Sequence, residues 1–301
     1  MKIIVTGGAG FIGKHLVEFL ITKGINVTIF DNFSNSKKNS IAYLKNQGVK
    51  IIEGDITKIQ DIVNAVKDQD MVIHLAAKIS VEESIKNSSE TFYTNVDGTK
   101  NVLIACKKNH IKKMIVSSSA AVYGESLPNI KLTEKSETHP ISPYGESKIM
   151  MEYEIKKLVE KYNVNCIILR FFNIFGIGQS SEYAGVITKF IKKIEMNEPL
   201  EIFGDGMQTR DFVSIKDIVN SIYNAMENGK NGTYNVASGK GITIKKLAEL
   251  MISLSKKDLK IIYIDTKKGD IRFSEADISL AKNELQYLPK YGVENVKNLL
   301  N

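Results

Sequence analysis

Short apolar runs rich in β-branched residues alternate along the chain with longer segments whose apolar residues recur at helical spacing. This alternation predicts β-strands at residues 2–6, 26–31, 50–53, 71–74, 113–117 and 165–169. Strands that alternate with helices form parallel sheets covered by helices on both faces. The expected fold class is therefore α/β, with a doubly wound parallel sheet.

A glycine-rich turn follows the first strand. Gly7, Gly10 and Gly13 lead into a helical pattern with one apolar face, and the next strand ends at Asp31. Glycines in such a strand–turn–helix unit let the backbone approach a pyrophosphate, and the helix N-terminus supplies N–H donors. The pattern predicts a dinucleotide site of the Rossmann type. A glycine turn with a purely structural role is the alternative.

Asp31 indicates which dinucleotide to expect. An acid at the end of the second strand, ~20 residues past the turn, can hydrogen-bond the adenosine ribose hydroxyls and repels a 2′-phosphate. NAD is therefore favoured over NADP.

Other candidate ligand contacts follow the third and fourth strands, at the carboxyl edge where parallel sheets bind ligands. Asp55 and Ile56 come directly after the third strand, and Leu75, Ala76 and Ala77 come after the fourth. The sequence therefore predicts one ligand site built from several strand ends.

A hydroxyl, a phenol and an ammonium group are the candidate catalytic groups. Ser119 follows the fifth strand, and Tyr144 and Lys148 share one face of a helix that Ser142 and Pro143 start. A lysine charge close to a tyrosine lowers the phenol pKa from about 10, so Tyr144 is expected to transfer protons. Ser119 can donate to a developing oxyanion or share a proton with Tyr144. The alternatives are a serine-rich turn and an ordinary surface Tyr–Lys pair.

Composition excludes several other classes of protein. The 301 residues are 43% hydrophobic and 25% charged, and the net charge of +7 arises from lysine pairs spread along the whole chain. Dispersed pairs are typical of solvated helix faces, so we expect no nucleic-acid partner. No secretory signal precedes the first strand, and no apolar run approaches the ~18 residues of a membrane span, so no membrane association is expected.

The cysteines and histidines indicate neither disulfides nor metal. Cys106 and Cys166 stand in apolar surroundings without redox or metal-binding spacing, which predicts buried reduced thiols in a cytoplasmic protein. The histidines, including His74, have no second candidate ligand at metal-binding spacing, so a structural role is favoured for them.

Taken together, the turn at residues 6–13, the serine after the fifth strand and the Tyr144-x-x-x-Lys148 pair resemble the extended short-chain dehydrogenase/reductase family. The resemblance runs from Met1 to about Leu285 and is closest to the UDP-glucose/UDP-galactose 4-epimerases. It implies an NAD cofactor, a UDP-sugar substrate and catalysis by Ser119, Tyr144 and Lys148. The implied cofactor contacts are Gly7, Gly10, Phe11, Ile12, Gly13, Asp31, Asn32, Asp55, Ile56, Leu75, Ala76, Ala77, Asn95, Tyr144, Lys148 and Phe172.

The resemblance also implies a set of substrate contacts. They are Ser119, Tyr144, Asn173, Gly185, Val186, Phe203, Arg210, Asp270 and Ser274. Ser274 would border the sugar pocket, where a serine leaves room for a 2-acetamido group and a tyrosine does not. UDP-N-acetylglucosamine and UDP-N-acetylgalactosamine are therefore possible additional substrates.

Arginine usage supports one of these contacts independently. The chain contains only Arg170, Arg210 and Arg272 among many lysines, and the planar arginine fork binds phosphate in a bidentate manner that lysine cannot. Arg210, in a predicted loop, is the candidate diphosphate clamp, whereas Arg170 at a strand end has either a binding or a structural role. Lys267 stands where the family more often has arginine.

The expected organisation has two lobes. Residues 1–170 form the NAD-binding Rossmann domain, to which the segment 211–225 returns, and residues 171–301 form a smaller nucleotide-sugar lobe. The resemblance further implies a homodimer that pairs through helices at residues 95–107 and 144–157.

Other functions stay open. A UDP-glucuronate 4-epimerase or decarboxylase would use the same groups. A 4,6-dehydratase needs an Asp–Glu pair where this chain has Ala120 and Ala121, and methyl groups cannot transfer protons. A non-catalytic NAD-binding scaffold would have little reason to keep Ser119, Tyr144 and Lys148 together.

Overall fold

A seven-stranded parallel sheet forms the larger part of the computed structural model, which describes residues 1–179, 185–266 and 269–300. Its strands, in spatial order, are β10 (Gly232–Val236), β6 (Asn165–Phe171), β5 (Lys113–Ser119), β4 (Met71–His74), β1 (Lys2–Thr6), β2 (Asn26–Asp31) and β3 (Lys50–Glu53). The predicted α/β class and doubly wound sheet are confirmed, and every strand predicted from the sequence is present. The sequence did not predict β10.

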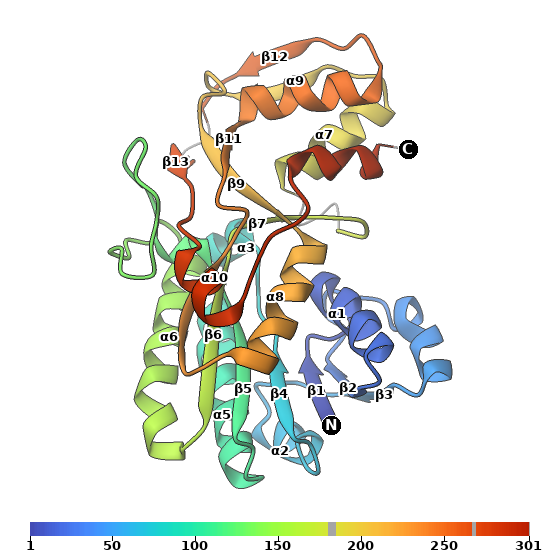
Figure 1. The fold of residues 1–301 in the computed structure, drawn as a ribbon, viewed down its shortest axis with the longest axis vertical. Helices are drawn as coiled ribbons and strands as arrows, with labels where there is room; N and C mark the ends of the chain where they lie inside the picture. The colour runs from blue at the N-terminus through green and yellow to red at the C-terminus, as the bar shows by residue number, and fades with distance from the viewer. Residues whose placement is uncertain (180–184, 267–268, 301) are drawn as a thin grey trace.

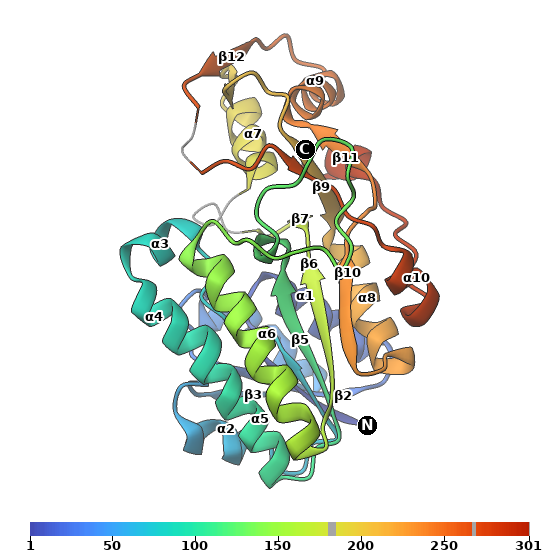
Figure 2. The same cartoon turned by 90° about the vertical axis from the view of Figure 1, so that its left-hand side faces the viewer.

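Helices cover both faces of this sheet (Figures 1 and 2). One face carries α1 (Phe11–Thr22) and α8 (Ile215–Asn228), and the other carries α2 (Ile59–Ala65), α5 (Gly98–Lys108) and α6 (Pro143–Tyr162). Side chains alternate between the two faces along each strand. In β1, Ile3 and Val5 join the core on the α1 side, and Ile4 joins the core on the α5 side.

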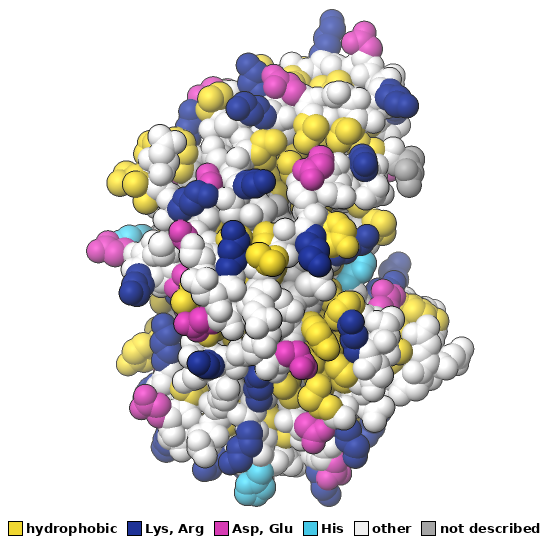
Figure 3. Space-filling view, in the orientation of Figure 1, with side chains coloured by type: hydrophobic (Ala, Val, Ile, Leu, Met, Phe, Trp, Pro, Cys, Tyr) yellow, Lys and Arg dark blue, Asp and Glu magenta, His cyan; other side chains and the backbone are white. Residues whose placement is uncertain are grey.

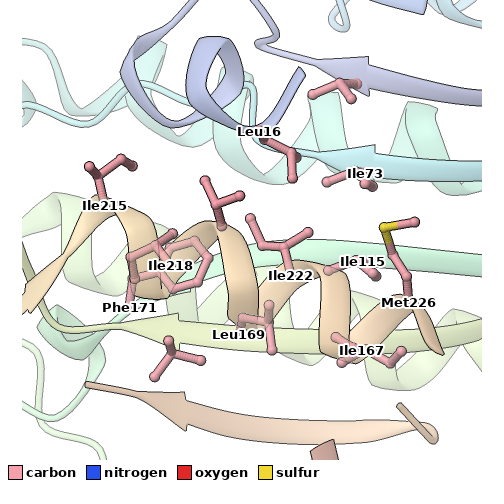
Figure 4. Packing of buried hydrophobic residues seen from close by; sticks show 14 of the residues in the cluster. Leu16, Ile73, Ile115, Ile167, Leu169, Phe171, Ile215, Ile218, Ile222 and Met226 are labelled. Atoms are coloured by element: carbon pink, nitrogen blue, oxygen red, sulfur yellow. The ribbon is translucent and has the colours of Figure 1, made fainter. Parts of the chain in front are cut away.

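The helix α8, which comes late in the chain, packs on the large sheet, most of whose strands come from the N-terminal half of the chain. Ile218, Ile222 and Met226 of α8 pack against strand residues such as Ile115 and Ile167 (Figure 4). Burial of such side chains contributes about 1.5–3 kcal/mol each. This packing fixes the position of the strand β9 (Thr209–Ser214), which directly precedes α8.

The second lobe lies beyond the carboxyl edge of the sheet (Figure 1). It contains a small sheet in which β11 (Gly241–Thr243), β9 (Thr209–Ser214) and β13 (Phe273–Ser274) are adjacent and β7 (Asn173–Phe175) pairs with β9. The strands β8 (Leu200–Phe203) and β12 (Ile261–Ile264) form a separate pair. Its longer helices are α7 (Val186–Glu195) and α9 (Ile244–Ser255).

Shorter elements complete the chain. They are α3 (Val81–Lys86), α4 (Ser88–Phe92), α10 (Ser279–Leu285), the π-helical turn Tyr93–Asp97 and the 3₁₀ turns Lys38–Gln47, Ala120–Val122 and Val293–Leu299. Lysine and arginine side chains are scattered among acidic ones over the face shown in Figure 3. No helix in the described parts of the chain is long and apolar enough to cross a membrane.

Candidate active site

A cavity of about 920 Å³ opens where the carboxyl edge of the large sheet meets the second lobe. Residues from both lobes line it, from Gly7 and Asp31 at the sheet to Phe203, Arg210 and Asp270 in the second lobe. The predicted site residues that come from distant parts of the sequence are thus brought together.

Backbone rather than side chains forms the cavity wall at the glycine turn. Gly7 has a φ of +69°, and a Cβ atom there would lie 2.6 Å from the backbone nitrogen of Ala76. A Cβ atom at Gly13 would lie 2.3 Å from the Gly7 oxygen. Gly10 is the N-cap of α1 and brings no capping side chain, so the first N–H groups of the helix remain for a ligand. This cradle fits a dinucleotide pyrophosphate.

Asp31 is held rigidly beside this turn. Its Oδ2 atom accepts a hydrogen bond from Ala9 N at 2.9 Å, and its Oδ1 atom accepts one from Phe33 N at 2.8 Å. Burial raises the pKa of this carboxyl group, and these backbone donors oppose the rise. The carboxylate lines the cavity at the end of β2, where it can accept hydrogen bonds from ribose hydroxyls.

Asp55 and Asn32 form a linked pair farther along the same wall. Asn32 Nδ2 donates to Asp55 Oδ2 at 3.1 Å, and Thr57 donates to Asp55 Oδ1 through its N–H and its hydroxyl, both at 2.8 Å. Other predicted cofactor residues that line the cavity are Phe11, Ile12, Ile56, Leu75, Ala76, Ala77 and Phe172.

Asn95 is the exception among the predicted cofactor contacts. It is 1% exposed and does not line the cavity. Its amide donates to Lys78 O at 3.0 Å and to Ser147 Oγ at 2.9 Å, and its Oδ1 accepts from Lys78 N at 2.8 Å. Asn95 therefore supports the cavity wall that Lys78 forms, and its contact with the cofactor stays a prediction.

The helix that carries Tyr144 and Lys148 begins as predicted. Pro143 is its first residue, and the Ser142 hydroxyl accepts a hydrogen bond from Gly145 N at 3.2 Å. Lys148 Nζ lies 6.0 Å from the centre of the Tyr144 ring and donates to Ser117 O at 3.1 Å. Both side chains and Ser119 line the cavity. The constellation of phenol, ammonium and hydroxyl is thus assembled in one place.

The expected effect on the Tyr144 pKa is not found. Burial raises the pKa of Tyr144, and the hydrogen bond with the Ser119 hydroxyl opposes this only in part. Burial also lowers the pKa of Lys148 to about 8. The prediction of a lowered tyrosine pKa is wrong for the protein alone, because desolvation disfavours the phenolate and the ammonium in the same enclosed site.

Residues of the second lobe complete the cavity. Arg210 Nη2 donates to Asp270 Oδ1 at 2.5 Å, and Asn173 Nδ2 donates to Asp211 O at 3.4 Å. Gly185 and Val186 line the cavity at the start of α7, and the Phe203 ring lines it from the end of β8. An arginine, an open helix start and an aromatic ring can bind a diphosphate and a base.

Ser274 does not line the cavity as expected. It is 6% exposed within β13 and pairs in register with Arg210 of β9. It is therefore a buried strand residue and not a solvated loop serine, and strand pairing places it beside Arg210 in the small sheet. Lys267, the predicted departure from the family, lies outside the described residues.

Several polar cavity residues were missed by the sequence analysis, among them Lys78, Lys189 and Gln208. Gln208 Nε2 donates to Phe203 O at 2.9 Å and to Asp270 Oδ2 at 3.4 Å. Only the position of Lys189, one helical turn after Gly185, could have indicated that it lines the cavity. Because lysine is abundant throughout the chain, this lysine did not stand out.

The histidines and cysteines have structural positions. His74 is 2% exposed, and its two ring nitrogens bond to the hydroxyls of Thr6 at 2.7 Å and Thr99 at 2.9 Å. Cys106 and Cys166 are buried free thiols, as predicted, and burial raises the pKa of Cys106 to about 12. The described residues contain no cluster of side chains that could hold a metal ion.

Comparison with known proteins agrees with this geometry. Residues 3–237 match the sequence model of the NAD dependent epimerase/dehydratase family. A UDP-N-acetylglucosamine 4-epimerase from Methanobrevibacter ruminantium, solved with UDP-N-acetylmuramic acid, is 38% identical and superposes with a TM-score of 0.92 over 99% of this chain and 97% of that one.

Two further solved structures are similar over the whole chain. A UDP-glucose 4-epimerase from Thermotoga maritima, solved with UDP-glucose, is 34% identical with a TM-score of 0.93 over 99% of this chain and 96% of that one. A UDP-glucose 4-epimerase from Thermus thermophilus, solved with NAD, is 26% identical with a TM-score of 0.91 over 100% of this chain and 99% of that one.

Proposed function

The chain belongs to the NAD dependent epimerase/dehydratase family, and from this we propose that it is an NAD-dependent 4-epimerase of UDP-hexoses. It interconverts UDP-glucose and UDP-galactose through a 4-keto sugar. The observation that carries the proposal is the shared cavity: Tyr144, Lys148 and Ser119 open into the same space as the glycine turn and Arg210. Groups for proton transfer, dinucleotide binding and diphosphate binding therefore face one another.

Tyr144 transfers the proton of the sugar 4-hydroxyl in this proposal. NAD, when bound, supplies the hydride acceptor and donor for C4. Lys148 holds the nicotinamide ribose and stabilises the Tyr144 phenolate, and the Ser119 hydroxyl donates to the O4 oxygen during proton transfer. Because burial raises the pKa of Tyr144 in the protein alone, the positively charged nicotinamide ring of NAD, when bound, would favour the phenolate together with Lys148.

The second lobe tethers the nucleotide while the keto sugar turns over. Arg210 and the open start of α7 bind the diphosphate, Asn173 contacts the sugar nucleotide, and Asp270 contacts the ribose. Phe203 packs on the base. With the nucleotide held in this way, the keto sugar could present either face of C4 to a cofactor held by the first lobe without being released.

The two lobes divide the ligands between them. The division into an NAD-binding domain at residues 1–170, with a returning segment at 211–225, and a nucleotide-sugar lobe at residues 171–301 remains a proposal. It is supported by the glycine turn in the first part and by Arg210 and Asp270 in the second. The first part would grip NAD along its length through Asp31, Asp55 and Lys148.

N-acetylated UDP-hexoses are proposed as further substrates. Ser274 pairs with Arg210 on the neighbouring strand of the small sheet and has a small side chain. A small residue at this position leaves the wall free to accommodate a 2-acetamido group. The similar enzyme from Methanobrevibacter ruminantium, a UDP-N-acetylglucosamine 4-epimerase, supports this extension.

Dehydration is not supported by the groups after Ser119. Ala120 and Ala121 form the 3₁₀ turn that follows β5, and their methyl groups can neither donate nor accept a proton. A UDP-glucuronate 4-epimerase remains compatible with the same catalytic groups, so UDP-glucuronate belongs in the substrate panel.

We also propose a cytoplasmic homodimer. The helices α3, α4, α5 and α6 lie along one side of the molecule in Figure 2, and these helices carry exposed apolar residues, including Ile85 of α3 at 67% and Tyr153 of α6 at 61%. Such residues favour burial against a second copy. Light scattering after size-exclusion chromatography tests this, and a monomer at micromolar concentration would contradict it. The buried free thiols fit a reducing compartment.

The decisive experiment is product analysis with purified protein. NMR should show UDP-galactose converted to UDP-glucose, and Tyr144→Phe should abolish the conversion while the protein stays folded. Loss of water or carbon dioxide from any UDP-sugar, seen by mass spectrometry, would instead indicate a lyase.

A further inference from the structure

Lys148 has a carboxylate neighbour with which it does not pair. Glu152 follows Lys148 by four residues in α6, and the two side chains are each 3% exposed. Side chains at this spacing share one helix face, where a lysine and a glutamate ordinarily attract each other. Yet Lys148 Nζ donates to Ser117 O at 3.1 Å, and it forms no ion pair within residues 1–179, 185–266 and 269–300.

Arg170 occupies both oxygens of that carboxylate. Its Nε donates to Glu152 Oε1 at 2.9 Å, and its Nη2 donates to Glu152 Oε2 at 2.6 Å. The Ser118 hydroxyl also donates to Oε1 at 2.6 Å. Glu152 therefore accepts charge-assisted hydrogen bonds in a fixed geometry, and its oxygens point to β5 and β6 instead of toward Lys148.

The guanidinium is itself fixed from a second direction. Arg170 Nη1 donates to the Tyr123 hydroxyl at 2.9 Å, and the Arg170 guanidinium carbon lies 4.8 Å from the centre of the Tyr123 ring. The Tyr123 hydroxyl donates to Asn235 Oδ1 at 2.6 Å. This network reaches from α6 through β6 to β10, so Arg170 cannot turn away from Glu152 without breaking several buried hydrogen bonds.

The alternative pairing would be strong in this environment. Opposite charges attract far more strongly in a buried site than in water, so an unoccupied Glu152 carboxylate would draw the Lys148 ammonium one turn along the helix. Glu152 already raises the pKa of Lys148 against the lowering by burial, which shows that the two charges interact. His74, the other titratable group that interacts with Lys148, is kept neutral by burial and cannot compete for the carboxylate.

We infer that Arg170 is a positioning residue that captures the Glu152 carboxylate and thereby leaves the Lys148 ammonium free to face the cavity. This inference rests on the proposed function, because it concerns the lysine that is assigned to the cofactor ribose and to Tyr144. It also explains why position 170 holds an arginine in a chain that otherwise uses mostly lysine. The single ammonium group of a lysine could not bind both oxygens of Glu152 in the way that the planar guanidinium does.

A double-mutant cycle tests the inference. Arg170→Gln should free Glu152 to pair with Lys148 and lower both the NAD retained on purification and kcat by about tenfold, a coupling typical of contacting charged residues. In Arg170→Gln/Glu152→Gln the competing carboxylate is gone, and both quantities should recover to within about threefold of wild type. Arg272→Gln is the matched control, because Arg272 pairs with Asp205 outside the cavity, and it should leave both quantities unchanged.

The outcomes separate positioning from structural support. If Arg170 only supports the fold, the double variant will be no better than Arg170→Gln, and that result overturns the inference. If Arg170→Gln gives no folded protein by circular dichroism, Arg170→Lys replaces it, and wild-type NAD retention and kcat in Arg170→Lys would equally overturn the inference. A wild-type protein that neither retains NAD nor acts on UDP-hexoses would refute the proposed function instead.

Discussion

Arg210 and Asp270 hold each other across the substrate half of the cavity, with Nη2 and Oδ1 separated by 2.5 Å. The two residues come from different segments of the second lobe, and Gln208 Nε2 also donates to Asp270, at 3.4 Å. The ion pair is partly buried, with side-chain exposures of 14% and 35%. The arginine is thus pre-oriented before a diphosphate arrives, which lowers the entropic cost of binding.

Arg210→Lys should therefore weaken substrate binding more than it slows catalysis. A lysine keeps the charge but loses the bidentate geometry, so we expect KM for UDP-galactose to rise about tenfold with kcat within about threefold of wild type. Steady-state kinetics measure both, and bound NAD should not change. Arg272→Lys serves as the control, since its partner Asp205 lies outside the cavity; an equal rise in KM for both variants would contradict the assignment of Arg210.

Gly7→Ala tests the cofactor cradle. The added Cβ would lie 2.6 Å from Ala76 N on a backbone with φ of +69°, so both crowding and strain oppose it. We expect no retained NAD. Gly24→Ala is the matched control, because Gly24 has a φ of +70° but no atom within 4 Å of the added Cβ. It should lower the free energy of unfolding by about 1 kcal/mol and retain NAD. Full NAD retention in Gly7→Ala, judged from nucleotide absorbance, would refute the cradle.

Lys148 is expected to lower stability in the absence of ligands. Burial lowers the pKa of Lys148 from its ordinary value of 10.5 to about 8 in the folded protein, so below pH 8 the side chain is buried while charged. As pH rises from 8 to 10.5, the unfolded chain keeps the proton that the folded protein has lost, and folding stability rises. At pH 7, Lys148→Met should consequently unfold at a higher urea concentration than NAD-free wild type. We expect its free energy of unfolding to be higher by about 1–3 kcal/mol.

The difference between Lys148→Met and wild type should shrink as pH rises through this window, because wild type then no longer carries the buried charge. Lys148→Met should also fail to retain NAD. A variant less stable than wild type at pH 7, or a difference independent of pH, would show that Lys148 imposes no such cost.

Ser274→Tyr tests the proposed tolerance for N-acetyl groups. A tyrosine in this buried strand position has to displace the neighbouring wall, and overpacking costs about 1–3 kcal/mol. Conversion of UDP-N-acetylglucosamine should fall at least tenfold more than conversion of UDP-glucose. Equal losses for both substrates would indicate that the substitution disturbs the fold in general. A wild-type protein without activity on N-acetylated substrates would contradict the proposal that it accepts them.

The sequence was a good guide where a local pattern determines structure. The apolar runs predicted the strands of the sheet from β1 to β6, and Ser142 with Pro143 predicted the start of α6, because strand runs and helix caps depend on neighbouring residues. The strand β10 was missed because its sequence, Gly232–Val236, begins with glycine and contains polar residues, so that no apolar run marks it. It pairs with β6 at the edge of the large sheet.

Properties that depend on burial were harder to predict. Asn95 and Ser274 match family motifs, but whether a residue lines the cavity or lies one layer behind it depends on packing that the motif does not contain. The direction of the Tyr144 pKa shift depends on desolvation by the whole fold, which outweighs the local Tyr–Lys spacing.

Conversion of UDP-galactose by protein purified without added NAD is the most direct test of the account. Wild-type protein should release nucleotide with NAD absorbance on denaturation and should bring UDP-galactose to equilibrium with UDP-glucose, as followed by proton NMR. Tyr144→Phe should retain NAD yet lose at least about a hundredfold in rate, as expected when a proton-transfer group is removed. Wild-type turnover by Tyr144→Phe, or activity in protein free of nucleotide, would contradict the account.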